Sequence, residues 1–338
     1  MSLPKVEFHR HLDGSVRFET ICELARANNL DLGVKDQNEL YHKCKILSPM
    51  DHLQAVLDCF WTTQKVLCHY EAIKRVAYEN VEDAYYDGVK LLELRFAMVF
   101  IAQQKKLAWD EIMAGVIDGV KLGREKYPIE VGLIHILPRS LSFAENQSAH
   151  DYFLRYHQQE VLGRDLCVGV DLADAEKEID SSPFIPLMAQ ARNQGLGITI
   201  HSGEDTDHHC MEKVIAQFNP QRIGHGVRAW GHSETMDLIK SAGIHLELCP
   251  SSNVLTQAVE SIPKHPFVQF WKSGIKVSLN TDDPHLMNLD LIHEYELMNQ
   301  VFHMGPEDFF QINQRAVADS FLDGDRKKHV LEQSFSGK

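Results

Sequence analysis

Two histidines separated by one residue, His9 and His11, end an apolar segment near the start of the chain. Successive side chains of a β-strand point to opposite faces, so positions i and i+2 share a face. A His-x-His pair on a strand therefore directs two imidazoles to one point, which suits a metal ion. Two solvated histidines in a turn are the alternative that this short motif leaves open.

Other residues that bind metals or transfer protons also follow apolar runs. They are His201 and Glu204, His225, and the pair Asp282 and Asp283. Three histidines and one carboxylate suit a divalent transition metal, Zn²⁺ above all, with one position left for water. Each residue taken alone is equally compatible with a core histidine or a helix cap, so the elements that carry them decide the interpretation.

Eight short strand-like runs, mostly separated by helix-like stretches, carry these residues. The runs are KVEFHRH (5–11), VKLLELRFA (89–97), EVGLIHILP (130–138), LCVGVDLA (166–173), LGITIHSGE (196–204), RIGHGV (222–227), IHLELCPSSN (244–253) and KVSLNTDDP (276–284). Their Val, Ile and Leu content is typical of parallel strands buried on both faces. Segments 70–88 and 233–243 between them have helical apolar spacing and end in Gly. The alternation predicts an α/β fold, a (β/α)8 TIM-type barrel, whereas a Rossmann arrangement would need a GxGxxG turn after an early strand.

We expect one barrel domain over residues 1–338, because no repeat, low-complexity tract or linker marks a boundary. An insertion at about 34–67 interrupts the alternation after the first strand. Within it, one helical apolar stripe at i, i+3, i+4 and i+7 is formed by Leu53, Val56, Leu57 and Phe60. This helix either packs on the barrel or forms a lid over its mouth.

The active site of such barrels lies at the carboxyl ends of the strands. The candidate residues above stand at that end of the first, fifth, sixth and eighth runs. The presence of these residues at the same end of four runs predicts a metal-dependent site. By contrast, His135 and His245 lie within runs, and His208 and His209 lie in a loop or helix start, so we interpret these four as satisfied or solvated histidines.

The composition describes an ordinary soluble globular protein of 338 residues, 44% hydrophobic and 24% charged. A net charge of −14 argues against binding to a phosphate backbone, so no nucleic-acid partner is expected. The seven scattered cysteines form no CxxC pair, which fits reduced thiols. We expect no signal peptide, and the apolar run FAMVFIA (96–102) is too short to span a membrane. These features predict a cytoplasmic protein with no membrane partner.

The motifs EFHRHLDG, HSGE, RIGHGV, CPSSN and SLNTDDP, in this order over nearly the whole chain, resemble the adenosine deaminase family of the amidohydrolase superfamily. NTDDP followed by DLIHEY is similar to its nucleoside-deaminating branch. The resemblance implies a distorted (β/α)8 barrel with one Zn²⁺ per chain. It also implies hydrolytic removal of the 6-amino group of adenosine or 2′-deoxyadenosine, so the partners are a small purine nucleoside and water.

The same resemblance assigns roles at the site. The implied metal ligands are His9, His11, His201 and Asp282. Glu204 matches the proton shuttle to purine N1, His225 the residue that orients the attacking water, and Asp283 the hydrogen-bond partner of N7. A bound Zn²⁺ lowers the pKa of its water from 15.7 to about 7, and a carboxylic acid near an apolar wall can be tuned to deliver the proton. The fourth run, GVDLADAE, has no lysine to bridge two metals, and the H-x-E…P-C-x-x-C signature of other zinc deaminases is absent.

Substrate-binding residues are also implied by the resemblance. Asp13 matches the residue that hydrogen-bonds the ribose 5′-hydroxyl, and the apolar stripe matches the family's helical lid. The expected substrate-binding set is His11, Asp13, Leu53, Val56, Leu57, Phe60, Asp174 and Asp283. Two residues depart from the family pattern. Ser202 replaces Ala in HSGE, and Asp174 replaces the glycine that offers its N–H to purine N3.

Three other functions stay open at this point. An adenine deaminase and a deaminase of a 5′-modified adenine nucleoside, such as 6-aminodeoxyfutalosine or methylthioadenosine, would share the same chemistry. A non-catalytic nucleoside-binding protein would need a missing ligand or proton shuttle, and the sequence retains both.

Overall fold

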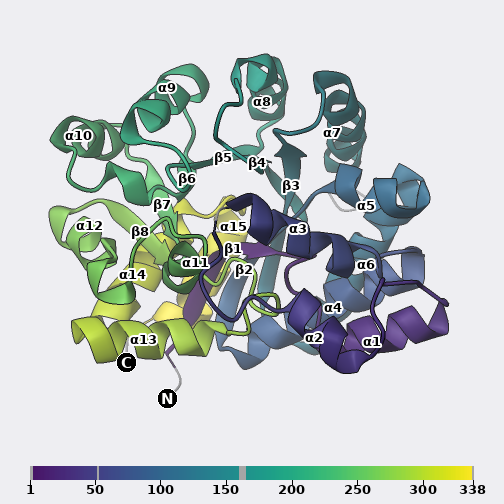
Figure 1. The fold of residues 1–338 in the computed structure, drawn as a ribbon. Coiled ribbons are helices and arrows are strands. Elements are labelled where there is room, and N and C mark those ends of the chain that lie inside the picture. Colours follow the sequence, from purple (N-terminus) through teal and green to yellow (C-terminus); the bar gives the residue numbers. More distant parts are fainter. Residues whose placement is uncertain (1–2, 52, 160–164, 337–338) are drawn as a thin grey trace.

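The computed structural model describes residues 3–51, 53–159 and 165–336. Its centre is a ring of parallel strands in which each strand pairs with its neighbours in the sequence (Figure 1). The strands are β1 (Lys5–His11), β2 (Val89–Phe96), β3 (Glu130–Pro138), β4 (Cys167–Ala173), β5 (Gly197–Ser202), β6 (Arg222–His225), β7 (His245–Leu248) and β8 (Lys276–Leu279). A parallel bridge between Arg10 and Asp282 joins the segment after β8 to β1 and closes the ring. The predicted (β/α)8 barrel is confirmed.

Helices surround the ring on its outside (Figure 1). They are α1 (Phe18–Ala27), α2 (Gln37–Cys44), α3 (Leu53–Gln64), α4 (Tyr70–Tyr86), α5 (Met98–Lys105), α6 (Trp109–Lys126), α7 (Phe143–Gln158), α8 (Ile185–Asn193), α9 (His208–Phe218), α10 (Ser233–Ser241), α11 (Pro250–Leu255), α12 (Phe267–Ser273), α13 (Leu291–Phe302), α14 (Pro306–Asp319) and α15 (Gly324–Val330), with the short turns η1 (Ser182–Phe184), η2 (Val227–Ala229), η3 (Ile262–Lys264) and η4 (Leu331–Phe335). The described helices include none long and apolar enough to cross a membrane.

The last three strands are shorter than their apolar runs predict. His225 ends β6 with a positive φ of 61°, and Asp282, after β8, has a φ of 67°. This left-handed conformation breaks the extended backbone. After β7, Pro250 begins α11, because the first helical position needs no N–H donor. His225 therefore stands at the end of β6, and Asp282 and Asp283 lie beyond the end of β8, where the sequence places site residues.

The amino-terminal end of the barrel is filled by side chains. The Arg222 guanidinium lies 4.2 Å from the ring centre of Phe8 and 3.6 Å from that of Phe321, which follows α14. Arg222 also pairs with Glu93 and, at 2.8 Å, with Glu247. Because this end is closed, the carboxyl ends of the strands provide the accessible face.

The insertion predicted at about 34–67 contains α2 and α3; its residue 52 lies outside the described residues. The predicted apolar stripe of α3 packs on a small cluster that contains Ile46, Leu286 and Met287. Leu53 and Val56 are buried in this cluster, whereas Leu57 and Phe60 are partly buried against it and also line a cavity at the barrel mouth. A role of Leu53 and Val56 in substrate binding stays a prediction.

Candidate active site

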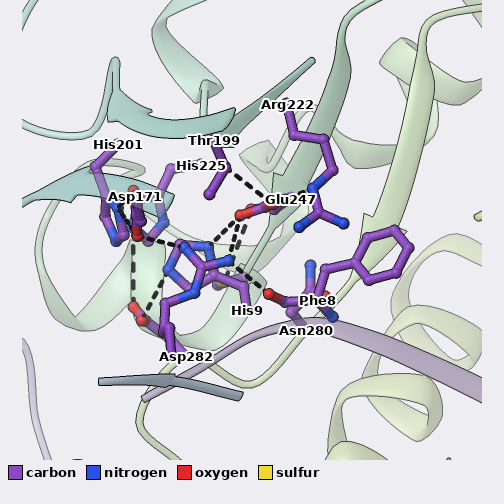
Figure 2. Close-up of polar contacts among 12 residues, drawn as sticks. Phe8, His9, Asp171, Thr199, His201, Arg222, His225, Glu247, Asn280 and Asp282 are labelled. Atoms are coloured by element: carbon purple, nitrogen blue, oxygen red, sulfur yellow. Dashed lines mark hydrogen bonds and ion pairs between the residues drawn. The ribbon is translucent and has the colours of Figure 1, made fainter. Parts of the chain in front are cut away.

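Four side chains from four strand ends meet in one buried group. The ligand atoms of His9, His201, His225 and Asp282 all lie within 4.8 Å of one another. His11 joins them, because its Nε2 lies 3.2 Å from Asp282 Oδ1 and 3.3 Å from His9 Nε2. The structure thus brings together every residue that the sequence proposes as a metal ligand, with His225 beside them. Figure 2 shows His9, His201, His225 and Asp282 of this group.

Buried carboxylates orient two of these imidazoles. His9 Nδ1 lies 2.9 Å from Glu247, and His201 Nδ1 lies 3.0 Å from Asp171. Both carboxylates are held by the fully buried guanidinium of Arg95, at 2.7 and 2.8 Å. Because each Nδ1–H donates to a carboxylate, each Nε2 keeps its lone pair and faces the centre of the group. Such carboxylate–histidine pairs are typical of protein metal sites.

The donor set fits a metal ion. The lone pair of His9 Nε2 faces Asp282 Oδ1 at 3.2 Å, and neither atom carries a hydrogen that could bridge them. Two acceptors at this distance repel each other unless a cation lies between them. Imidazole nitrogens with one carboxylate oxygen suit a divalent transition metal.

The backbone around the group permits this close approach. A Cβ built on Gly224, in β6, would lie 2.9 Å from the His9 ring and 3.3 Å from the His201 ring. Asp282 is held from its other side, since Ser252 in α11 donates to Asp282 Oδ2 at 2.7 Å. Residue 224 must therefore lack a side chain for the imidazoles to pack as they do.

Glu204 lies beside the group at the start of the β5–α9 loop. Its Oε2 is 3.4 Å from His225 Nε2, and its buried Oε1 has no hydrogen-bond partner among the described residues. Burial and the nearby carboxylates of Asp282 and Glu176 raise the pKa of Glu204 to about 8. Glu176 also accepts hydrogen bonds from the N–H groups of Gly203 and Glu204, at 2.8 and 3.0 Å, and so holds this loop. A neutral Glu204 carboxyl can donate a proton to a bound molecule.

Asp283 is a second buried carboxyl, and one of its oxygens lies within 4.8 Å of ligand atoms of His11 and Asp282. Burial and the charges of Asp282 and Asp13 raise its pKa well above the ordinary value. Its Oδ1 has no hydrogen-bond partner in the described part of the chain. A Cβ on Gly14 would lie 1.8 Å from this oxygen, so the glycine makes room for it. Asp283 is thus prepared to hydrogen-bond an acceptor atom of a ligand.

An apolar cavity of about 190 Å³ opens beside His11. Its lining residues come from α3, α5 and the ends of β1, β2, β3 and β4: His11, Asp13, Gln54, Leu57, Phe60, Trp61, Gln64, Ala97, Phe100, Gln103, Ile136, Ser140, Leu141, Ala173 and Asp174. Asp13 Oδ2 accepts a hydrogen bond of 2.6 Å from Gln64. Among the described residues, no lysine or arginine belongs to this lining, so the described wall offers apolar groups and carboxylates to a ligand.

Asp174 occupies the position where the family glycine is expected, and it keeps the glycine-like backbone with φ of 75°. Its carboxylate is turned onto Ser140, which donates to it through both its N–H, at 3.2 Å, and its hydroxyl. The N–H of Ala175 also donates to Asp174, at 2.8 Å. The additional carboxylate is therefore held by local donors at the edge of the cavity. Ser202, the other departure, is buried at the end of β5.

The four histidines that we interpreted as satisfied or solvated lie outside the group. His135 is fully buried in β3, and His245 in β7 pairs with Asp319 at 3.2 Å. His208 and His209 begin α9 and are partly or largely exposed.

Several residues of the site were missed by the sequence analysis. Glu247, Asp171 and Arg95 lie in the middle of apolar strands, where a charged residue rarely stays unpaired, and this was the available signal. Gln64 and Trp61 carried no comparable signal, because polar and aromatic residues are common on amphipathic helices.

Comparisons with known proteins agree with this geometry. The family described as adenosine deaminase matches residues 4–335. The chain is 34% identical over 328 residues to the adenosine deaminase of Shewanella loihica, with 97% of each chain covered. The adenine deaminase of Arthrobacter aurescens has the same fold, with a TM-score of 0.87 at 23% identity over 99% of this chain and 98% of that one. The apo N6-methyl-AMP deaminase of Arabidopsis thaliana gives a TM-score of 0.85 at 26% identity over 100% and 97%.

Proposed function

Because the chain belongs to the adenosine deaminase family, we propose that it removes the 6-amino group of adenosine and 2′-deoxyadenosine by hydrolysis, giving inosine or 2′-deoxyinosine and ammonia. The observation that carries this proposal is the meeting of a metal-binding group, two carboxyls with raised pKa and an apolar cavity at one end of the barrel. The neutral carboxyls can serve purine N1, which is bonded to the amino-bearing carbon, and N7, which lies on the other side of the amino group.

We propose one Zn²⁺ per chain, held by His9, His11, His201 and Asp282. When bound, Zn²⁺ lowers the pKa of a water molecule from 15.7 to about 7 and so supplies a nucleophile at neutral pH. Asp171 and Glu247 keep the two oriented imidazoles in the tautomer that leaves Nε2 free.

The protein side chains perform the remaining steps. Glu204, neutral because of its burial, donates a proton to purine N1, which makes the amino-bearing carbon more electrophilic. Asp283 donates its carboxyl hydrogen to N7, an acceptor, and so fixes the ring. His225 orients the water beside Glu204. The α3 lid, through Leu57 and Phe60, excludes solvent from this reaction.

Substrate choice rests on Asp13 and Asp174. Asp13 Oδ2 already accepts a hydrogen bond from Gln64, and its carboxylate faces the cavity, where it would accept the ribose 5′-hydroxyl. The two carboxylates disfavour a 5′-phosphate, since like charges repel and the described lining residues include no lysine or arginine. The N6-methyl-AMP deaminase named above acts on a nucleotide, so AMP is the informative competitor.

Ultraviolet assays of the purified protein with adenosine, 5′-deoxyadenosine, methylthioadenosine, adenine and AMP test this proposal. Adenosine should have the highest kcat/KM of the five compounds. Loss of a hydrogen bond to a charged group, worth about 1.5–3 kcal/mol, should lower kcat/KM for 5′-deoxyadenosine by about 10- to 150-fold. Higher kcat/KM for adenine or methylthioadenosine than for adenosine would replace the proposal by one of the alternative deaminases.

The Asp174→Gly variant sharpens the test. Because Ser140 holds this carboxylate away, restoring glycine should change kcat/KM for adenosine by less than about tenfold, or roughly 1.4 kcal/mol. A hundredfold gain would mean that Asp174 obstructs adenosine and that another substrate fits this cavity.

A further inference from the structure

Behind His225, away from the cavity, a line of hydrogen bonds leads to a backbone N–H. Asn253 Nδ2 lies 3.0 Å from His225 Nδ1, and Asn253 Oδ1 lies 3.0 Å from His265 Nε2. The N–H of Phe267, at the start of α12, donates to His265 Nδ1 at 3.2 Å. Asn253 and His265 are both fully buried, so water does not compete for these contacts.

The direction of this line is determined from its backbone end. The Phe267 N–H is a donor only, so His265 Nδ1 must be an acceptor and the His265 hydrogen must be on Nε2. That hydrogen needs the amide oxygen of Asn253, which leaves the amide nitrogen to donate to His225. His225 Nδ1 is therefore an acceptor, and the hydrogen of neutral His225 is on Nε2, the atom that faces Glu204 and Asp282.

The surroundings keep His265 in the form that this argument requires. Burial and the neighbouring His225 lower its pKa to about 3, so it is neutral at physiological pH. A charged His265 would carry a hydrogen on Nδ1 that opposes the Phe267 N–H.

We infer that Asn253 and His265 are positioning residues that set the tautomer of His225, so that His225 donates a hydrogen bond into the site from Nε2. This inference rests on the proposed function. It assigns His225 to the donors that hold an oxygen atom in place during the reaction, a role in which one preorganised donor contributes about 10²–10³-fold in kcat.

Neutron diffraction of the zinc-loaded protein at neutral pD tests the tautomer directly and without any assay. We expect deuterium on Nε2 of both His265 and His225 and on Nδ1 of neither. Deuterium on His225 Nδ1 would overturn the inference, whatever substrate the protein uses. Failure of the proposed function would instead appear as inactivity of the unmodified protein on adenosine.

The isosteric Asn253→Asp variant tests the consequence for the reaction. A carboxylate accepts from both histidines, so His225 would move its hydrogen to Nδ1 and present a lone pair to the site. We expect kcat to fall about 10²-fold or more, with KM and zinc content unchanged, since neither Asn253 nor His265 lines the cavity. A kcat within threefold of the unmodified protein would contradict the inference.

The matched control is Asn313→Asp. Asn313 is also fully buried and hydrogen-bonded, but it lies in α14, bonded to Tyr295 and Pro4. It should lose stability as any buried amide-to-acid change does, and it should keep kcat. An equal loss of kcat in both variants would show a general effect of the buried charge and count against the inference.

Discussion

Two pairs of buried histidines in this barrel differ in the groups that contact their ring nitrogens. His9 and His201 each direct Nδ1 at a carboxylate 2.9 or 3.0 Å away and leave Nε2 free at the strand ends. His135 and His150 are as deeply buried and stack with ring centres 6.3 Å apart, yet no described carboxylate forms a hydrogen bond or ion pair with either ring. Burial and residue type are the same in both pairs. The orienting carboxylates are what distinguishes the proposed ligands from the core histidines.

The largest expected effect comes from removing one member of the metal-binding group. His11→Ala should abolish deamination and metal retention together, because the remaining donors no longer complete the ligand set. Elemental analysis and adenosine turnover measure both. His135→Phe is the control of equal type and burial, and it should keep one zinc per chain. Two metals per unmodified chain would contradict the proposed single-zinc site.

The next prediction separates metal binding from proton transfer. Glu204→Gln keeps the shape of the side chain but removes its acidic hydrogen, so kcat should fall by about 10²–10⁴-fold. Zinc content should not change, because Glu204 is not in the ligand group. A variant with nearly normal turnover would show that the proton comes from another residue.

A substitution of Asp171, the carboxylate that orients His201, tests whether such a carboxylate distinguishes the two pairs of histidines. Asp171→Asn should weaken metal affinity by about 10- to 100-fold, the usual cost of losing such a partner, because the amide has no charge and offers a single acceptor oxygen to both Arg95 and His201. Competition with a chelator measures this affinity. Unchanged affinity would mean that position in the barrel alone makes His201 a ligand.

The smallest expected effect concerns His135 and His150, the pair that no described carboxylate orients. Burial lowers the pKa of His135 to about 3 and that of His150 to about 4, from an ordinary 6.5. The unfolded chain therefore binds protons below pH 6.5 that the folded protein does not bind until about pH 4, so stability falls as pH falls through this window. His135→Phe should reduce the slope of unfolding free energy against pH by up to about 1.4 kcal/mol per pH unit. Chemical denaturation at several pH values measures the slope, and parallel slopes for both proteins would refute the prediction.

Much of this arrangement was predictable from the sequence because both the barrel and the site repeat a local pattern. Each strand is a short apolar run, and the reactive residues follow directly, so the positions of His9, His201 and Asp282 needed only the rule about strand ends. The orienting residues could not be placed in the same way. Glu247 reaches His9, and Arg95 reaches both Glu247 and Asp171, only through the register of non-adjacent strands across the barrel.

The lid was predicted less well. Its helix follows from the apolar spacing, but the spacing does not say which apolar face meets which neighbour. Leu53 and Val56 contact the segment after β8, which the chain brings there from far along the sequence. The cavity wall is made by the next positions of the helix, Leu57 and Phe60.

The bridge between Arg10 and Asp282 determines when, during synthesis and folding, the site can form. His9 and His11 are made well before Asp282, which follows the last strand of the barrel. The group of candidate ligands is therefore incomplete until all eight strands have been synthesised and the segment after β8 has met β1. We therefore expect the proposed zinc site to gain full affinity only at ring closure, so metal uptake during synthesis would report the moment at which the barrel closes.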